Sequence, residues 1–486
     1  MRTLVIDVGT SGLRAAIIND DATVSDLHYE IFAPSSPAGG LVEFDAKEMY
    51  QAVKRVATAA LASGPVAAVG ITNQRASTIM WRASTGEPLG PAIGWQDLRT
   101  IGECIMMRIE HGLAFAPNQT ATKAAWMLKN YVSDDAERAS DDIRIGTVDS
   151  WLIWNLTHGA HFVTDHSNAG VTGMCEPSAT QWSESVLSTL GIQRNHLARI
   201  VDSSGYVGEA VDLPGAPPIM AMVGDQQASL VGQGCISPGM AKITFGTGGM
   251  LNMFTGTTAP DRAARREHGT FPIVAFSRAG EISYGTEAIM LAAGTNIEWL
   301  HTDMGLLSSP EESDAVAASI TSTEGVAYVP ALLGLGTPHW DYGARGALFG
   351  ITRGTTKSHI VRAVLEGVAH RGVDLARAAE QDSGLTISEL RIDGGMSKNS
   401  TFVQALADAA GIPVRVSPFS EATTLGAGFL AGVEAGQWSH LHEATGAISG
   451  ARTIEPLGEP GLSRQQWDEA VSRARSWIPD LSALDF

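Results

Sequence analysis

The same short pattern occurs twice in this chain, once near its start and once near its middle. Residues 5–17 read VIDVGTSGLRAAI, and residues 242–254 read KITFGTGGMLNMF. In each, a β-rich apolar run reaches a Gly-Thr-x-Gly turn and a second apolar run follows at once, which predicts a β-hairpin. A hairpin that recurs in both halves of the sequence predicts two related domains that each begin with the same motif.

The segments around the hairpins predict an α/β fold. Asp45 has the position of an N-cap for an amphipathic helix over 46–62. The other elements we expect are strands at 23–31, 66–71, 390–392 and 414–416, and helices at 359–381, 426–434 and 465–477. At roughly 100–200 residues per domain, a chain of 486 residues holds two to four domains. We therefore expect an N-terminal domain of residues 1–237 and a C-terminal domain of residues 238–486.

Composition argues against several classes of protein. With 33 Lys and Arg against 52 Asp and Glu, the net charge is −19, so no nucleic-acid partner is expected. No apolar run approaches the roughly 18 residues of a membrane-spanning helix, so no membrane partner is expected either. Asp7 interrupts the first apolar run where a signal peptide would be uncharged, and the three cysteines are too widely spaced for a disulfide framework. We therefore expect a cytoplasmic protein.

Three glycine turns that follow strands suggest a phosphate site. They lie at 9–12, 246–249 and 394–395, and such turns let backbone N–H groups approach an anion. One alone is most simply a turn, but Asp7 and Asp393 also precede two of the three, and an acid beside a phosphate can hold Mg²⁺. The P-loop pattern GxxxxGK[ST] and the HRD and DFG signatures are absent, so a nucleotide would be bound on another scaffold.

Two phosphate hairpins, a Gly-Gly turn and two similar domains resemble the actin-like ATPase superfamily. Within it, the chain is similar to the FGGY carbohydrate kinases, and among these to the glycerol kinases. The stretches that carry the resemblance are IDVGTSGLRAAI (6–17), GITNQRASTIMW (70–81), IGWQDLRT (93–100), GTVDSWLIWNLTHG (146–159), VTDHSNA (163–169), VGDQQASLVGQG (223–234), FGTGGML (245–251), the segment 329–369 and IDGGMSKNSTFVQALAD (392–408). The resemblance implies two actin-like, ribonuclease H-like domains with a catalytic cleft between them. It also implies transfer of the γ-phosphoryl group of ATP to a sugar or polyol hydroxyl.

The resemblance assigns the nucleotide and metal contacts residue by residue. Asp7 and Asp225 are expected to organise Mg²⁺. The residues expected around ATP are Thr10, Ser11, Gly12 and Arg14 in the first hairpin, Gly246 and Thr247 in the second, and Gly394, Gly395, Met396 and Asn399 near the ribose and purine. Gly294 and Glu298 are also expected on the nucleotide side. Glu298 stands where glycerol kinases usually have Gln.

Asp225, in VGDQQ, matches the general base of the family. Its carboxylate would accept the hydroxyl proton as the oxygen attacks phosphorus, in a transition state stabilised mostly by positioning and electrostatics. From the local residues alone, the favoured interpretation is a helix N-cap. The catalytic assignment therefore comes from the resemblance.

The acceptor contacts of glycerol kinases are only partly present. Those that match are Arg75, Trp95, Asp225 and Gln226. Three differ, because Ala76 replaces a Glu, Asn118 a Tyr and Met250 a Phe. Loss of a charge-assisted hydrogen bond costs about 1.5–3 kcal/mol. We expect a wider, less charged pocket that prefers a four- or five-carbon polyol or ketose to glycerol.

The alternatives are a glycerol kinase proper, an actin-fold ATPase that is not a kinase, and a catalytically silent sugar-binding homologue. Arg75, Trp95 and the Asp225-Gln226 pair in one chain favour a kinase over a chaperone or filament protein. Asp7, Thr10, Asp225 and Thr247 together argue against a silent homologue. The sequence leaves open the acceptor, the phosphorylated position and the oligomeric state, a homodimer included.

Overall fold

The computed structural model describes residues 1–419, 422–458 and 461–484. The strands of the N-terminal half are β1 (Arg2–Val8), β2 (Gly12–Asn19), β3 (Val24–Ile31), β4 (Glu43–Phe44), β5 (Ala68–Asn73), β6 (Ile79–Arg82), β7 (Ala92–Ile93), β8 (Ile143–Gly146), β9 (Val163–Asp165), β10 (Arg199–Val201), β11 (Ser204–Glu209) and β12 (Pro218–Gly224). Its helices are α1 (Ala46–Leu61), α2 (Ile101–His111), α3 (Thr120–Tyr131), α4 (Asp135–Arg138), α5 (Val148–Leu156), α6 (His166–Gly170), α7 (Glu184–Leu190) and α8 (Asp225–Gly232), with a 3-10 turn at Arg194–His196.

The C-terminal half is also made of strands and helices. Its strands are β13 (Ala241–Phe245), β14 (Gly249–Gly256), β15 (Phe271–Arg278), β16 (Glu281–Met290), β17 (Ala327–Val329), β18 (Ala347–Phe349), β19 (Leu390–Asp393), β20 (Val414–Val416) and β21 (Arg452–Ile454). Its helices are α9 (Thr295–Thr302), α10 (Glu312–Ala318), α11 (Lys357–Ser383), α12 (Ser400–Ala410), α13 (Ala422–Glu434), α14 (Leu441–Gly446), α15 (Arg464–Ala474) and α16 (Pro479–Ser482), with a 3-10 turn at Gly395–Lys398.

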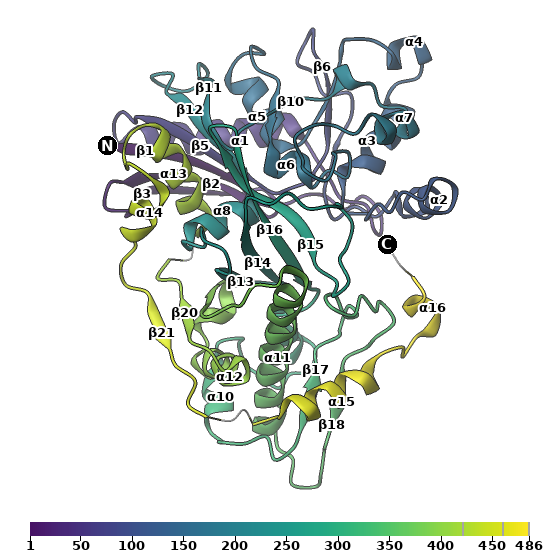
Figure 1. Ribbon diagram of the computed structural model, residues 1–486, viewed down its shortest axis with the longest axis vertical. Coiled ribbons are helices and arrows are strands. Elements are labelled where there is room, and N and C mark those ends of the chain that lie inside the picture. The colour runs from purple at the N-terminus through teal and green to yellow at the C-terminus, as the bar shows by residue number, and fades with distance from the viewer. Residues whose placement is uncertain (420–421, 459–460, 485–486) are drawn as a thin grey trace.

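One sheet of 13 strands runs through the molecule in the order β21-β20-β19-β13-β14-β16-β15-β11-β12-β5-β1-β2-β3 (Figure 1). Each half contains the same arrangement. In the first, β3, β2 and β1 are antiparallel neighbours, and β5 and β12 continue parallel to β1. In the second, β16, β14 and β13 are antiparallel neighbours, and β19 and β20 continue parallel to β13. The two glycine hairpins occupy equivalent places, which confirms the predicted repeat and the two-domain α/β fold.

Helices cover both faces of the N-terminal sheet. Leu4 and Ile6 of β1 pack in one apolar cluster with Met49 of α1. Val5, between them in sequence, packs on the other face in a cluster with Phe429 of α13. Successive side chains of a strand point to opposite faces, so a strand covered on both sides is apolar throughout. This explains the unbroken apolar run at the start of the chain.

Helix α13 comes late in the sequence but packs on the N-terminal sheet, against β1, β5 and β12, and against α8. A Cβ on Gly232 of α8 would lie 1.8 Å from the carbonyl oxygen of Ala422. A Cβ on Gly426 of α13 would lie 1.8 Å from the carbonyl oxygen of Ala228. The missing side chains therefore let the two helix backbones touch. The domain boundary expected at 237/238 stays a prediction, since α13 belongs in space to the first half.

The C-terminal half is built around α11, which packs against β14, β16 and α12. The helix expected over 359–381 is confirmed, and five of its residues are fully buried: Val361, Val364, Leu365, Val368 and Leu375. Phe245 at the end of β13 and Phe402 of α12 meet edge to face at 4.9 Å between ring centroids in the same core. This core fixes the end of β13, from which the second glycine turn departs.

The expected elements are present, with differences at their ends. Asp45 caps α1 as predicted, accepting hydrogen bonds from the backbone N–H of Lys47 at 2.8 Å and of Glu48 at 3.1 Å. The last long helix was expected to reach residue 477, but α15 ends at Ala474. Ser476 then has φ +54°, outside the helical region, and leaves the Trp477 side chain 72% exposed.

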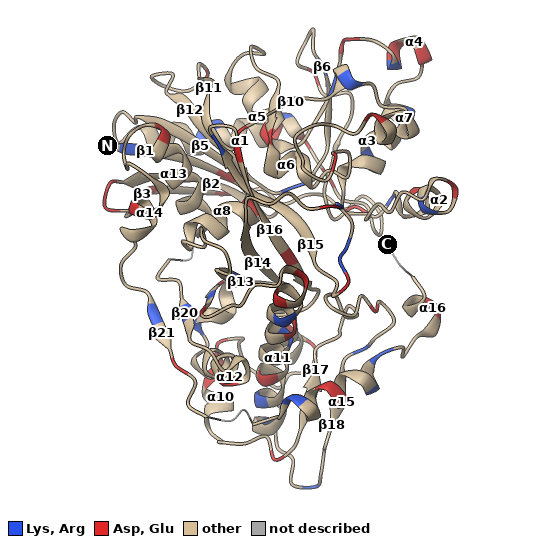
Figure 2. Cartoon of the chain, in the orientation of Figure 1, with Lys and Arg blue, Asp and Glu red and all other residues tan. Residues whose placement is uncertain are grey.

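Charged side chains are dispersed over the fold. Figure 2 shows Lys and Arg spread over both halves, without a continuous basic element. Among the residues that the structure describes, no helix is long and apolar enough to cross a bilayer.

Candidate active site

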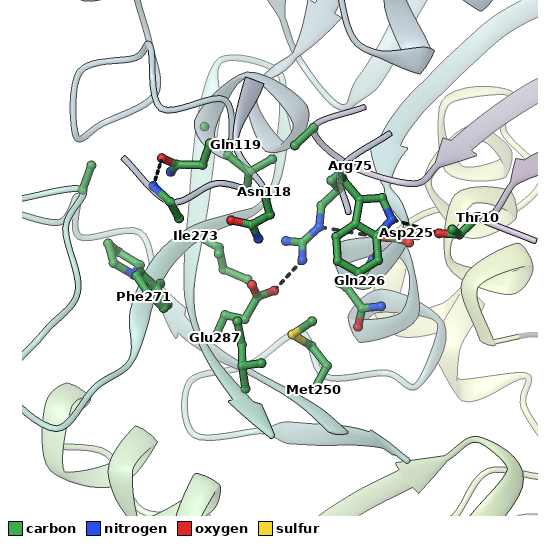
Figure 3. Close-up of a pocket in the computed structure, with 18 residues that line it drawn as sticks. Thr10, Arg75, Asn118, Gln119, Asp225, Gln226, Met250, Phe271, Ile273 and Glu287 are labelled. Carbon is green, nitrogen blue, oxygen red and sulfur yellow. Dashed lines mark hydrogen bonds and ion pairs between the residues drawn. The ribbon is translucent and has the colours of Figure 1, made fainter. Parts of the chain in front are cut away.

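A pocket of about 180 Å³ lies where loops of the N-terminal half meet β14, β15 and β16 (Figure 3). All seven residues expected around the acceptor line it: Arg75, Ala76, Trp95, Asn118, Asp225, Gln226 and Met250. The structure thus brings together residues from five separate segments of the chain. We call this cavity the acceptor pocket.

Asp225 is the first residue of α8, and Gly224 before it is the N-cap. The interpretation of Asp225 as an N-cap is therefore wrong, because its carboxylate faces the pocket. Its Oδ1 accepts a hydrogen bond of 2.7 Å from the backbone N–H of Gln226 and lies 3.5 Å from Arg75 Nε. Burial raises the pKa of Asp225, and the positive charge of Arg75 opposes that rise. A raised pKa makes the ionised carboxylate a stronger base.

Arg75, two residues beyond the end of β5, lies between two carboxylates. Its Nη2 contacts Glu287 Oε2 at 2.9 Å, and its Nε faces Asp225. The third nitrogen, Nη1, is buried and has no hydrogen-bond partner among the described residues. A buried guanidinium nitrogen without a partner is costly unless a ligand or water satisfies it. Arg75 Nη1 is therefore a donor available to a bound acceptor (Figure 3).

Gln226 is oriented from behind by a buried lysine. Lys242 of β13 donates from Nζ to Gln226 Oε1 and to Thr244 Oγ1, both at 2.9 Å. Burial lowers the pKa of Lys242. With its oxygen engaged, Gln226 presents its amide NH₂ as the remaining polar group of the side chain.

The three substituted positions form the less polar part of the pocket. Ala76 contributes a methyl group, and its backbone has φ +62°, a strained conformation for a non-glycine residue. Its carbonyl oxygen accepts a hydrogen bond of 3.1 Å from Thr120 Oγ1 at the start of α3, which fixes the loop. Figure 3 shows the Asn118 amide and the Met250 thioether directed into the same cavity.

A second pocket, of about 580 Å³, lies wholly in the C-terminal half. Seven of the residues expected around the nucleotide line it: Gly246, Thr247, Gly294, Glu298, Gly395, Met396 and Asn399. Gly394, just before Gly395, has φ +88°, and a Cβ there would lie 2.4 Å from the carbonyl oxygen of Phe245. Only glycine allows the turn to pass this close to the second hairpin. Asn399 caps α12 through Phe402 N–H and donates to Ser313 Oγ at 3.0 Å, so its amide shapes the wall.

The first glycine hairpin lies on the acceptor side instead. Thr10 lines the acceptor pocket, while Ser11, Gly12 and Arg14 line neither of the two cavities. The turn closes with a hydrogen bond of 3.0 Å from Gly9 N–H to the Gly12 carbonyl. Their contacts with phosphate stay a prediction.

Asp7, at the foot of that hairpin, is only 4% exposed. Its Oδ2 lies 3.5 Å from Arg14 Nε and accepts a hydrogen bond of 3.4 Å from Thr424 Oγ1 of α13. A carboxylate held between the hairpin and α13 is oriented by both. Its expected role near Mg²⁺ also stays a prediction.

Among the residues that the sequence analysis did not name are two charged ones that contact expected acceptor residues. Glu287 lines the acceptor pocket, and Lys242 supports Gln226. In the sequence, Glu287 is one polar position in the strand EISYGTEAIM, and Lys242 is one cation just before a glycine turn. The repeat offered one weak signal, because it aligned the segment of Lys242 with the phosphate hairpin.

Comparison with known proteins agrees with this geometry. The N-terminal domain of the FGGY family of carbohydrate kinases matches residues 2–232, and its C-terminal domain matches residues 241–435. Glycerol kinase of Aromatoleum aromaticum is 40% identical over 496 residues, which cover 98% of this chain and 99% of that protein. Glycerol kinase of Trichlorobacter lovleyi is 39% identical over 495 residues, with 98% and 99% covered.

Solved structures give the same result. Plasmodium falciparum glycerol kinase with ADP superposes with a TM-score of 0.89 at 26% identity, covering 100% of this chain and 99% of that one. A xylulose kinase from Brucella ovis superposes with a TM-score of 0.85 at 25% identity, with 100% of both chains covered. The chain is thus an enzyme, an ATP-using phosphotransferase that acts on an alcohol group of a sugar or polyol. On its fold, its matched domains and the identity over its full length, the chain belongs to the FGGY family of carbohydrate kinases.

Proposed function

We propose that this kinase phosphorylates a four- or five-carbon polyol or ketose in preference to glycerol. One observation carries the proposal: the acceptor pocket keeps Arg75 and Asp225, while Ala76, Asn118 and Met250 line it together. A methyl, an amide and a thioether stand where glycerol kinases have a carboxylate, a phenol and a phenyl ring. The pocket then has room and hydrogen-bonding capacity for an acceptor with more carbons and hydroxyls than glycerol.

Asp225 acts as the general base. The acceptor hydroxyl gives its proton to the Asp225 carboxylate as its oxygen forms a bond to the γ-phosphorus, and the bond from that phosphorus to the β,γ-bridging oxygen breaks, releasing ADP. The raised pKa of Asp225 supports this role, since a more basic carboxylate is a better proton acceptor. Arg75 Nη1 holds a neighbouring hydroxyl of the acceptor, which orients the reacting one.

ATP binds with its base and ribose in the C-terminal pocket and its phosphates toward the two glycine hairpins. Asp7 and Asp225 would hold Mg²⁺, which would neutralise charge on the phosphates. Among the described residues, no group of three or more metal-ligating side chains is present. The two carboxylates of Asp7 and Asp225 fit Mg²⁺, which is usually bound through one or two carboxylates and phosphate oxygens.

A coupled ADP-release assay on the purified chain tests the acceptor. We expect kcat/KM to be higher for erythritol, threitol, xylitol or xylulose than for glycerol. A missing methylene-sized contact is worth about 1–3 kcal/mol, so glycerol remains a slower substrate. If glycerol is preferred by about tenfold or more, the chain is a glycerol kinase with a repacked site.

We infer a cytoplasmic location from the dependence on ATP and from the three free cysteines, Cys104, Cys175 and Cys235. Cell fractionation tests it, and recovery of the enzyme outside the cytoplasm would contradict it. A homodimer stays a prediction, for which light scattering is the measurement.

A further inference from the structure

We propose that Glu287 selects the acceptor, by accepting a hydrogen bond from a hydroxyl that only acceptors longer than glycerol present. This rests on the proposed function and names a residue outside the set taken from the family resemblance. The observation behind it is a pocket carboxylate with one oxygen engaged and the other available.

Glu287 is held rigidly in the middle of the sheet. It lies on β16, opposite Asn252 of β14 in the strand register, and its side chain is 9% exposed. Oε2 accepts from Arg75 Nη2 and from Asn252 Nδ2, both at 2.9 Å. Oε1 has no hydrogen bond to any residue that the structure describes, and Glu287 lines the pocket. Each carboxylate oxygen can accept two hydrogen bonds, so Oε1 is ready for a ligand.

The position of Glu287 relative to Asp225 defines which hydroxyl it meets. The two carboxylates contact different nitrogens of the Arg75 guanidinium, at Nη2 and Nε. Figure 3 shows them on different sides of that group, with Asp225 toward Thr10 and Glu287 away from it, near Asn118. The reacting hydroxyl must lie at Asp225, so Glu287 meets a hydroxyl farther along the acceptor.

The alanine at position 76 increases the importance of the Glu287 carboxylate for acceptor binding. Glycerol kinases have a Glu beside the matched Arg, and here that position offers a methyl group. With that acid missing, Asp225 and Glu287 are the acidic side chains that line the acceptor pocket. The carboxylate that accepts a hydrogen bond from the substrate thus lies at position 287, on a different wall of the pocket from position 76. This placement favours acceptors that reach that wall.

A purely structural role would look different. Arg75 belongs to the N-terminal half and Glu287 to the C-terminal half, so their ion pair also connects the two. If this connection were the whole role, loss of the charge would affect every acceptor equally and would lower the melting temperature.

The test is Glu287→Gln in the full chain, with kcat and KM measured for glycerol, erythritol and xylitol. We expect KM for erythritol and xylitol to rise about tenfold to a hundredfold, the scale of one hydrogen bond to a charged group. We expect KM for glycerol to rise by a smaller factor, because glycerol loses only the effect of Glu287 on Arg75, so the ratio of kcat/KM for xylitol to that for glycerol falls about tenfold or more. Glu281→Gln is the matched control, because it makes the same change at the exposed start of the same strand.

Equal losses on all three acceptors, or a fall in kcat alone, would overturn the assignment of Glu287. If Glu287→Gln is recovered unfolded, Glu287→Asp is the test variant, because it keeps the negative charge and moves it one methylene farther from the acceptor. A changed ratio of kcat/KM between erythritol and xylitol then supports the assignment, and an unchanged ratio overturns it. The wild-type preference judges the proposed function separately: a wild type that prefers glycerol contradicts that function, whatever the variants do.

Discussion

The indole N–H of Trp95 donates a hydrogen bond of 3.0 Å to the hydroxyl of Thr10. Trp95 is a wall of the acceptor pocket, and Thr10 belongs to the first glycine hairpin, so the two parts of the site are directly connected. Trp95 is itself fixed by its backbone, which accepts from Lys123 Nζ at 2.9 Å and donates to Ser77 Oγ at 3.0 Å. The indole donor is thus engaged by the protein, and Trp95 presents an apolar surface to the pocket.

Trp95→Phe is expected to keep the apolar wall and release Thr10. A net hydrogen bond is worth about 1 kcal/mol, so we expect kcat to fall about fivefold while KM for the acceptor changes little. Steady-state kinetics with saturating ATP measure both. Trp477→Phe, at an exposed site, is the control. A larger effect on KM than on kcat would mean that the indole N–H binds the acceptor directly.

Asp225→Asn keeps the shape of the side chain and removes the proton acceptor. We expect kcat to fall by about 10²–10⁴, the scale of general-base catalysis, with acceptor binding roughly retained. Because the folded state holds the proton of Asp225 more tightly than the unfolded chain, the ionised carboxylate costs stability at pH 7. The variant should therefore melt no lower than the wild type at that pH. Turnover near the wild-type rate would exclude Asp225 as the base.

The pH profile of the wild type follows from the same carboxylate. The base works only when ionised, and burial raises its pKa above the ordinary value of 3.8. Activity should therefore fall on acidification at a pH above that value. The negative charge of Glu287 also raises the pKa of Asp225, so Glu287→Gln should move the acidic limb of kcat/KM for glycerol to lower pH. An acidic limb at the same pH in both proteins would contradict the coupling.

Gly426→Ala tests the contact between α13 and α8. The new methyl group would lie 1.8 Å from the carbonyl oxygen of Ala228, so the helices must separate. Overpacking of this kind costs about 1–3 kcal/mol, which a denaturant titration resolves. Gly446→Ala is the matched control, since a Cβ at that glycine meets no atom within 4 Å. Equal stability of the two variants would show that the helix pair is not close-packed in solution.

Local patterns predicted the hairpins, the long apolar helix and the cap at Asp45, because these depend on neighbours in sequence. The motifs of the family named seven residues that line each cavity, but they did not name Lys242, Glu287 or other lining residues such as Gln119 and Asp314. Glu287 could not be singled out, since a polar residue in a strand is the same in sequence whether it faces solvent or a buried arginine. Its meaning depends on Arg75, far away in the chain, and on the register of β14 with β16.

The place of α13 was likewise beyond local prediction. A helix was expected over 426–434, but the sequence of such a helix does not indicate which sheet it covers. The reason for Gly232 and Gly426 is visible only when α8 and α13 are seen in contact.

The position of α13 also sets the order in which the molecule can be completed during synthesis. One face of the first sheet, including Val5 and Ile18, is buried by residues that begin at Ala422 of a 486-residue chain. Until that segment leaves the ribosome, a nascent N-terminal half exposes an apolar surface. Asp225, the proposed general base, is the first residue of α8, the helix that α13 packs against. Translation therefore supplies α8 well before α13, and we expect a product truncated before residue 422 to expose this apolar surface, to aggregate and to be inactive.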